Sequence, residues 1–594
     1  MCGIVGFIGK NIEKNLVDIL KKLEYRGYDS SGIAVIENNK IKCTKSAGNI
    51  DNLEKIIMPS GATCGIAHTR WATTGMPSVL NAHPHLSQNK KWGVVHNGII
   101  ENYTNLKKEL INKNVSFKSD TDTEVIAQML EKTKSKGIFS LIEVCKKLEG
   151  SYALACLNEN YNNTLFLARK KSPLYVAKTS KNIICASDPI CFVGFCKYYY
   201  ALEDGEFCTA NLKALEFYNT NGEKITKNKQ KLDGMQQETN KIKFKHFMKK
   251  EILETNFVLK RIMQNYLNYN YLQKFDKNFI NKFNQIVFVG CGTAYHAGLV
   301  GAYYIEKFAK IRTKCFIASE FRYINPLIDE NTLCIFVSQS GETLDTILSL
   351  ELASQKGAYT IALTNVLYSS LAKKAEYILP IFAGPEIAVV STKAFSAQVA
   401  VLFLFAKQLE TIKTNTTLEF FEKNVKKLQS FTFFNNIFLK KLANELKSEN
   451  HIFLIGKGLD YLACLEASLK FKETSYLNAS AYPSGELKHG FLSLVEIGTY
   501  IFAVITNKEM INKTLNSAEE AQCRGAKVIL VTTESIDKEK LKNIYKIVKI
   551  KNCDSDLAII QTMIFFQQLC YELALLKNIN PDKPRNLAKS VTVE

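Results

Sequence analysis

The second residue of the chain, Cys2, carries the chemistry that this sequence indicates most directly. Removal of Met1 would leave a thiol and a free α-amine on one residue. Cysteine is intrinsically a strong nucleophile, although only a few per cent of it is thiolate at neutral pH. An α-amine has a pKa of about 7.7–8.0, so it can accept the proton that the thiol loses. We therefore expect Cys2 to supply both nucleophile and base to a site that later segments complete.

Five later segments contain the polar residues that such a site needs. In chain order they are residues 26–32 (RGYDSSG), 66–73 (IAHTRWAT), 81–85 (NAHPH), 95–102 (VHNGIIEN) and 119–124 (SDTDTE). Together with residues 2–6 (CGIVG), this ordered set resembles the glutaminase domain of N-terminal-nucleophile amidotransferases. The resemblance implies a four-layered αββα fold and hydrolysis of glutamine.

The resemblance also implies a role for each polar group. Arg70 suits the α-carboxylate of glutamine, because a guanidinium can bind it through two hydrogen bonds, and Asp122 suits the α-ammonium. Attack of the thiolate on the amide creates an oxyanion, for which the Asn97 side chain and the Gly98 backbone N–H are the implied donors. An Asn-Gly pair is also a common hairpin turn, but the ordered set of segments favours the catalytic interpretation.

Trp71, Thr73 and His83 are implied at the same glutamine site, with Trp71 as the gate of an ammonia passage. For His83 and its neighbour His85, a purely structural role stays as plausible as a functional one.

Length and composition limit the class of protein. A chain of 594 residues is too long for one core, and 46% hydrophobic with 23% charged residues is typical of globular domains. The longest apolar run in the second half, residues 399–406, is too short to span a membrane, and no secretory signal opens the chain. The 16 scattered cysteines show no zinc-binding spacing and suit a reducing, cytoplasmic setting.

The net charge of +20 raises the possibility of nucleic-acid binding. The lysines are spread along the chain, however, without a basic arm or a helix-turn-helix motif. We expect no nucleic-acid partner, and a basic surface that attracts acidic substrates such as sugar phosphates.

The sequence pattern changes near residue 237. Short alternating strands such as 183–186 and 206–209 precede it, whereas apolar runs alternate with helical patterns after it, as in α/β folds with parallel sheets. The predicted division is a glutaminase domain (1–237), a linker (238–245), two α/β domains (246–430 and 431–580) and a C-terminal tail (581–594).

The two α/β domains are predicted to be copies of one unit. Residues 288–293 (FVGCGT) parallel residues 453–459 (FLIGKGL), each a buried strand that enters a Gly-x-Gly turn and a helix. Residues 355–364 parallel residues 523–532 at nearly the same separation. Two matches at similar offsets indicate two doubly wound αβα domains.

Residues 338–343 (SQSGET) distinguish the first copy from the second. Hydroxyls and N–H groups at a strand-to-helix junction can bind an anion. No Walker lysine is present, so a phosphate monoester fits better than a nucleotide. One hydroxyl would indicate only a helix cap, but Ser338, Ser340 and Thr343 together favour a phosphate site.

Residues 338–343 are similar to the motif of sugar-isomerase (SIS) domains, and with the glutaminase segments the whole chain resembles the glutamine–fructose-6-phosphate aminotransferases. The likeness includes residues 390–395 (VSTKAF), 484–490 (SGELKHG) and 584–594 (PRNLAKSVTVE). It implies that fructose 6-phosphate and glutamine become glucosamine 6-phosphate and glutamate, the first step of amino-sugar synthesis, with no metal or organic cofactor.

The resemblance assigns the sugar chemistry as well. His489, from a neighbouring subunit of a homodimer, opens the sugar ring with help from Glu486; Lys589 forms a Schiff base; and Glu473 moves the proton between C1 and C2. Lys470, one helical turn before Glu473, could stabilise the enolamine, although the two could also form an ordinary helix salt bridge. The implied contacts with the sugar phosphate come from Thr293, Ser338, Gln339, Ser340, Thr343, Val389 and Ala588.

Several positions depart from the family pattern. Ala294 replaces a usual serine and so removes a hydroxyl from the sugar site. The other departures are Asn478, Ser480, Pro385 and Ala388, and none of them removes an implied catalytic group.

Three other functions remain open from the sequence alone. Another glutamine amidotransferase would need an ATP-pyrophosphatase or phosphoribosyltransferase half, of which we find no motif. A sugar-phosphate sensor would not need Cys2, Glu473 and His489 together. A nucleic-acid scaffold would have to bind DNA with a strong dependence on salt.

Overall fold

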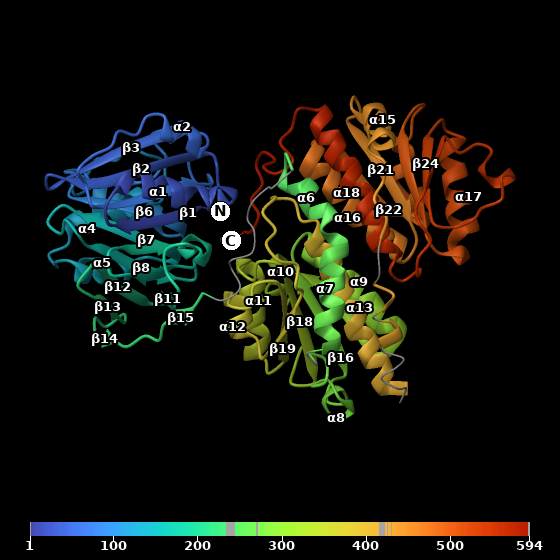
Figure 1. Ribbon diagram of the computed structural model, residues 1–594, viewed down its shortest axis with the longest axis horizontal. Helices are drawn as coiled ribbons and strands as arrows, with labels where there is room; N and C mark the ends of the chain where they lie inside the picture. The colour runs from blue at the N-terminus through green and yellow to red at the C-terminus, as the bar shows by residue number, and fades with distance from the viewer. Residues whose placement is uncertain are drawn as a thin grey trace. The chain divides into compact units, whose positions relative to one another are not determined.

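The computed structural model describes residues 2–232, 244–268, 271–414, 422–424, 426–428 and 431–591. The chain forms two compact units, Met1–Glu238 with Ala588–Glu594 and Thr239–Leu587 (Figure 1). Most of the predicted linker 238–245, the predicted boundary at 430 and the last three residues of the predicted tail lie outside the described residues.

The first unit contains two antiparallel sheets. Cys2 directly precedes β1, a central strand of the eight-stranded sheet, whose order is β15 (Gln230–Lys231), β11 (Tyr198–Ala201), β9 (Tyr175–Lys178), β10 (Ile183–Ala186), β1 (Gly3–Ile8), β4 (Cys64–Arg70), β2 (Ser30–Glu37) and β3 (Lys40–Ala47). The seven-stranded sheet has the order β14 (Lys224–Ile225), β13 (Leu215–Tyr218), β12 (Glu206–Ala210), β8 (Leu165–Lys170), β7 (Gly150–Asn158), β6 (Trp92–Ile100) and β5 (His85–Leu86).

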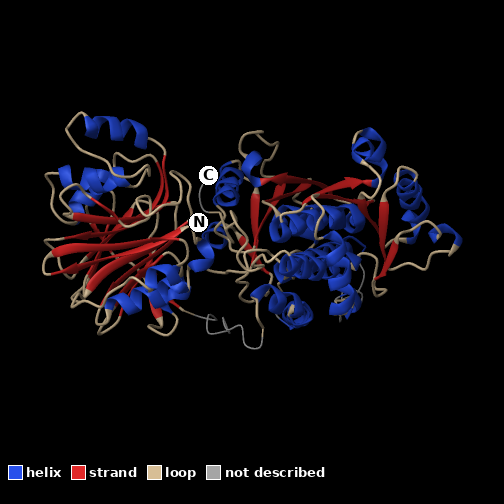
Figure 2. Ribbon diagram, turned by 90° about the horizontal axis from the view of Figure 1, so that it is seen from above, coloured by secondary structure: helices blue, strands red, loops and turns tan. Residues whose placement is uncertain are grey.

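Strand β1 shows why the sheets stack. Successive side chains of a strand point to opposite faces. Ile4 and Ile8 pack into the core between the two sheets, whereas Val5 and Phe7 pack into the core under α1 (Ile12–Lys21) and α2 (Ile50–Glu54). Helices α3 (Tyr103–Ile111), α4 (Glu124–Lys132) and α5 (Ile138–Cys145) cover the outer face of the second sheet. The predicted αββα layering is therefore confirmed (Figure 2).

The second unit contains two parallel five-stranded sheets. Their orders are β17 (Arg312–Ile317), β16 (Gln285–Gly290), β18 (Thr332–Ser338), β19 (Tyr359–Thr364) and β20 (Tyr377–Pro380), and β22 (Asn478–Pro483), β21 (His451–Gly456), β23 (Tyr500–Ile505), β24 (Lys527–Thr532) and β25 (Lys546–Lys549). The strands that carry the repeated motifs occupy equivalent places, because β16 matches β21 and β19 matches β24. The predicted pair of doubly wound domains is confirmed.

Helices cover both faces of each parallel sheet and share one large core on the inner faces. The α-helices among the described residues of this unit are α6 (Phe247–Leu253), α7 (Thr255–Asn268), α8 (Lys277–Ile280), α9 (Thr293–Tyr304), α10 (Ala318–Phe321), α11 (Leu344–Gln355), α12 (Ser370–Lys374), α13 (Lys393–Thr414), α15 (Asn436–Leu446), α16 (Leu459–Ser475), α17 (Ile511–Gln522) and α18 (Ala558–Leu576). Two of them, α13 and α18, are long and apolar enough to cross a membrane, but both are mostly buried in this core. Their composition therefore reflects packing on all sides.

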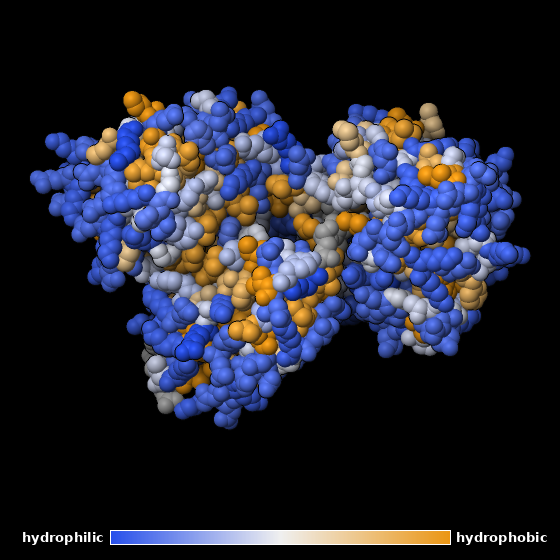
Figure 3. Space-filling view, turned by 180° about the vertical axis from the view of Figure 1, so that it is seen from behind, coloured by the Kyte–Doolittle hydropathy of each residue, from blue (hydrophilic) through white to orange (hydrophobic). Residues whose placement is uncertain are grey.

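On the face seen in Figure 3, hydrophilic residues cover much of each unit, with groups of hydrophobic residues among them.

Candidate functional site

Cys2 meets Trp71 because β1 pairs with β4. The register places Gly3 opposite Thr69, and this brings Trp71, the residue after β4, next to Cys2. The backbone N–H of Trp71 donates to Cys2 Sγ at 3.3 Å. Burial raises the pKa of the Cys2 thiol, while this N–H and the Arg70 charge act in the opposite direction. A thiol that is buried and neutral needs a base, and the α-amine left by removal of Met1 would lie on the same residue.

The predicted oxyanion donor Asn97 is held by two opposed contacts. Its Nδ2 donates to the backbone oxygen of Cys2 at 2.8 Å, and its Oδ1 lies 3.1 Å from His68 Nε2. His68 Nε2 also faces the carbonyl oxygen of His96 at 2.9 Å, so two acceptors assign the proton to Nε2. His68 thus fixes which end of the Asn97 amide faces Cys2. Sequence reasoning did not select His68.

Gly98 follows Asn97 in β6 and has a φ of 136°, a region that favours glycine. A Cβ at this position would overlap the carbonyl oxygen of Ser151 on β7. Position 98 therefore requires glycine on steric grounds.

Arg70 and Asp122 act electrostatically on the same thiol, as expected for groups that line one site. Arg70 Nη2 donates to the carbonyl oxygens of Thr74 and Gly75, the latter at 3.0 Å, whereas its buried Nη1 has no hydrogen-bond partner among the described residues. Asp122 Oδ2 accepts from the backbone N–H of Ile100 at 2.8 Å. An unpaired buried guanidinium nitrogen is costly unless a ligand satisfies it, which fits a substrate carboxylate.

The other predicted glutamine-site residues differ in their surroundings. Trp71 packs edge-on against Tyr28 at 6.2 Å between ring centroids, while Thr73 is exposed. His83 is buried, stacks on His68 at 4.1 Å and accepts from the backbone N–H of His96. His83 therefore lies behind His68 and supports it, and burial keeps its pKa well below the ordinary value.

The second unit contains a buried network where α9 meets α16. Lys470 Nζ lies 2.6 Å from Glu473 Oε2, 3.2 Å from Glu466 Oε1 and 3.0 Å from Thr293 Oγ1. Glu466 also accepts from Thr293 at 2.9 Å, and its other oxygen lies 2.7 Å from His296 Nδ1. The structure thus brings together the predicted residues Thr293, Lys470 and Glu473.

Charge pairing decides the state of Lys470. Its complete burial would lower its pKa, but the carboxylates of Glu466 and Glu473 outweigh this effect and raise the pKa above the ordinary value. Burial would likewise raise the pKa of Glu466, yet Lys470 and His296 hold it below the ordinary value. Lys470 is therefore a fixed cation. Glu466 and His296 were missed by sequence reasoning, although Glu466, Lys470 and Glu473 have the spacing of one helix face.

The predicted phosphate residues gather between β18 and α11. Ser338 Oγ lies 3.4 Å from Thr343 Oγ1 and accepts from the N–H of Gly341, while Ser340 Oγ accepts from the N–H of Glu342. Gly341 has a φ of 65°, and a Cβ there would overlap the Ser369 hydroxyl. The loop is therefore folded by its own hydroxyls at the start of a twelve-residue helix. The backbone of Gln339, its remaining predicted member, accepts from the N–H of Asn365.

Glu486 and His489 are not brought to this network. Both lie in the short helix Ser484–His489 and both are exposed. Ala588 and Lys589 belong to the first compact unit, and Lys589 is half-buried there.

Val389 is tied to the C-terminal tail, since its N–H donates to the carbonyl oxygen of Asp582 at 3.0 Å. The Asp582 carboxylate accepts from the N–H groups of Phe247 and Met248 at the start of α6. Glu251 accepts from Ile387 and Ala388 nearby. Asp582 and Glu251 thus join the start of the tail and the segment that carries Val389 to α6, and neither was selected from the sequence.

Comparison with known proteins supports both halves of the chain. A glutamine amidotransferase domain model matches residues 68–193, and an SIS domain model matches residues 279–408 and 445–569. Proteins named glutamine–fructose-6-phosphate aminotransferase [isomerizing] from Caldanaerobacter subterraneus subsp. tengcongensis and Clostridium acetobutylicum are 41% and 40% identical, over the full length of both chains. The solved C-terminal domain of glucosamine-fructose-6-phosphate aminotransferase from Francisella tularensis is 32% identical, with a TM-score of 0.54, and covers 58% of this chain and 100% of its own.

Proposed function

The chain belongs to the glutamine–fructose-6-phosphate aminotransferase family, and we propose that it converts glutamine and fructose 6-phosphate to glutamate and glucosamine 6-phosphate. The observation that carries this proposal is the presence of two separate clusters of reactive side chains on one chain. One is the Cys2–Asn97 pair together with Arg70, whose Nη1 has no hydrogen-bond partner among the described residues. The other is the Lys470–Glu473 pair.

Glutamine hydrolysis takes place at Cys2. The α-amine accepts the thiol proton, and Sγ attacks the side-chain amide carbon of glutamine. The second hydrogen on Asn97 Nδ2 and the Gly98 N–H stabilise the oxyanion, since the other Nδ2 hydrogen binds the Cys2 carbonyl. Arg70 Nη1 binds the α-carboxylate and Asp122 the α-ammonium. The C–N bond breaks, ammonia leaves, and water releases glutamate from the thioester.

Sugar binding uses the loop before α11. The phosphate occupies the helix N-terminus with Ser338, Gln339, Ser340 and Thr343, and Thr293, Val389 and Ala588 contact the sugar. His489, assisted by Glu486, opens the ring, and Lys589 forms an imine with C2 by loss of water. Ammonia displaces the lysine, so that nitrogen becomes bonded to C2.

Isomerisation then moves protons between C1, C2, oxygen and nitrogen. Glu473 removes a proton from C1 while the imine nitrogen gains one, which gives an enolamine. Glu473 returns its proton to C2 as the C1 hydroxyl loses its own proton and becomes an aldehyde. The fixed charge of Lys470, 2.6 Å from the Glu473 carboxylate, stabilises negative charge in this step and holds that carboxylate in place.

Two further parts of the proposal concern assembly and setting. Because Glu486 and His489 are exposed, and neither is among the contacts of Lys470 in the described part of the chain, we propose that they serve the site of a second subunit in a homodimer. Trp71 gates the passage of ammonia. All 16 cysteines are free, which suits a reducing cytoplasmic setting.

The test is product analysis after glutamine and fructose 6-phosphate are mixed with the purified protein. Glucosamine 6-phosphate and glutamate in equal amounts are expected from the wild type. The variant Cys2→Ala should make the amino sugar only when ammonia is supplied. Glutamate without amino sugar, from a folded protein, would contradict the proposed acceptor.

A further inference from the structure

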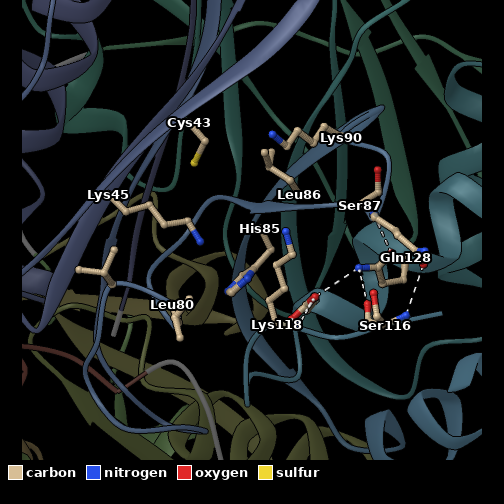
Figure 4. A pocket seen from close by; sticks show the side chains of 13 residues that line it. Cys43, Lys45, Leu80, His85, Leu86, Ser87, Lys90, Ser116, Lys118 and Gln128 are labelled. Atoms are coloured by element: carbon tan, nitrogen blue, oxygen red, sulfur yellow. Dashed lines mark hydrogen bonds between the residues drawn. The ribbon is translucent and has the colours of Figure 1, made fainter.

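A pocket of about 300 Å³ lies in the glutaminase unit outside the residues assigned to glutamine (Figure 4). Its wall is formed by β3, β5, α4 and the segments around residues 79–80, 87–90 and 116–118. This volume is at the lower end of the range for small-molecule sites. The proposed hydrolysis of glutamine does not use the pocket.

Three lysines from three separate segments line the pocket: Lys45, Lys90 and Lys118. Lys45 is partly buried, and the ammonium groups of Lys45 and Lys118 point toward His85 in the close-up (Figure 4). None of the three ammonium groups forms a hydrogen bond or an ion pair within the described part of the chain. Lys90 and Lys118 are exposed, and cations in a pocket wall without such partners favour an anionic ligand.

The one carboxylate in the wall, that of Glu124, is already engaged. It accepts from the backbone N–H groups of Lys118 and Ser119, from the Ser119 hydroxyl and from Gln128 Nε2, at distances from 2.6 to 3.2 Å. Its charge still acts on Lys45, but one carboxylate against three lysines leaves the pocket with an excess of positive charge.

We propose that this pocket binds a small phosphate monoester with an apolar group, the phosphate between Lys45, Lys90 and Lys118. A carboxylate is best bound by the fork of an arginine, and the lining contains no arginine. Lysines bind phosphate as point charges, and a monoester carries nearly two negative charges at neutral pH. Leu80 and Leu86, with Val79 beside them, supply the apolar part of the wall.

The pocket adjoins the segment that carries Asp122. His85 forms part of the wall, and its Nε2 lies 3.1 Å from the Thr121 hydroxyl, one residue before Asp122. On its other side His85 meets His83 edge-on at 4.7 Å. A ligand in the pocket thus touches a side chain that holds the glutamine site from behind.

Site-resolved lysine labelling tests the proposal, since binding at the sugar-phosphate site cannot imitate it. The full chain is treated with a trace of acetic anhydride, with and without phenyl phosphate, and acetylation of each lysine is read by mass spectrometry. The reaction is run at mildly alkaline pH because lysine reacts through its neutral amine, and burial lowers the pKa of Lys45. At a probe concentration of twice the dissociation constant, labelling of Lys45 and Lys118 should fall about threefold by mass action.

The internal control is Lys40, which is exposed on the same strand as Lys45 and outside the pocket. Its labelling should not change, and inorganic phosphate should protect Lys45 less well than phenyl phosphate. The variant Lys45→Met should lose protection of Lys118, whereas Lys40→Met should retain it. Glutamine hydrolysis by both variants verifies folding. Unchanged labelling of Lys45, or equal protection of Lys40, would overturn the proposal.

Discussion

Lys470 and Glu473 form an ion pair on α16 with an Nζ–Oε2 distance of 2.6 Å, in which the lysine is completely buried. Glu466, one turn earlier, is also completely buried and shares the same ammonium group at 3.2 Å. One cation thus serves two carboxylates, one fully enclosed and one partly accessible. This arrangement leaves Glu473 as the member that can reach a substrate.

Replacement of Lys470 by methionine should abolish amino-sugar synthesis and leave glutamine hydrolysis intact. Removal of one partner from a buried pair costs about 3–5 kcal/mol, so the second unit should also lose stability. The comparison variant Glu473→Gln keeps the shape of the base but not its charge. Both products are measured in one assay; normal glucosamine 6-phosphate synthesis by Lys470→Met would show that the cation is dispensable.

Substitution His68→Phe should lower kcat for glutamine hydrolysis more than it changes KM. The ring is retained, but Asn97 Oδ1 loses the donor that fixes its amide. Loss of an oxyanion donor itself costs about 10²–10³ in kcat, so a positioning residue should cost less than about 10². Steady-state kinetics of His68→Phe, Asn97→Ala and the double variant show whether His68 acts through Asn97. Fully additive effects would mean that His68 does not act through Asn97.

The glutaminase unit should lose stability as the pH falls below about 6.5. Burial lowers the pKa of His68 to about 3 from an ordinary value of 6.5, so in this window the unfolded chain binds a proton that the folded chain does not. The contribution is complete above pH 6.5 and is lost progressively toward pH 3. Both tryptophans, Trp71 and Trp92, lie in this unit, so their fluorescence during urea unfolding reports on it selectively.

The matched variant for this experiment is again His68→Phe, which cannot take up the proton. Its midpoint should fall less than that of the wild type between about pH 7.5 and about pH 5.5. Equal losses in the two proteins would assign the acid sensitivity to other groups.

Two inactive variants should restore activity when they are mixed as subunits of one dimer. His489→Ala removes the proposed ring-opening group and Glu473→Gln the proton-transfer base, and a mixed dimer contains one intact site if His489 serves the neighbouring subunit. Random exchange would then recover about a quarter of wild-type activity. The assay follows glucosamine 6-phosphate after the mixture is unfolded and refolded. No recovery, with dimers present, would place His489 in the site of its own chain.

Local motifs made much of this site predictable. Cys2, Asn97 and residues 338–343 could be selected because each lies in a short motif that carries the family resemblance. The repeated Gly-x-Gly turns likewise indicated two doubly wound domains, since each copy has its own strand and helix.

The supporting residues could not be predicted in this way. His296 reaches Glu466 only because α9 packs against α16. Asp582 meets Met248 of α6 although 334 positions separate them in the sequence. Glu466 was within reach, because its spacing to Lys470 and Glu473 places all three on one helix face. His68 resembled an ordinary buried strand residue until pairing of β4 and β6 with β1 and β7 placed it beside Asn97.

Transfer of labelled nitrogen tests the central claim most directly, namely that ammonia freed at Cys2 becomes the amine of the sugar. Glutamine labelled with ¹⁵N in its side-chain amide is supplied with fructose 6-phosphate and an excess of unlabelled ammonium. The wild type should make glucosamine 6-phosphate that carries mostly ¹⁵N, and Cys2→Ala only unlabelled product. Unlabelled amino sugar from the wild type, or labelled ammonia released without amino sugar, would contradict the claim.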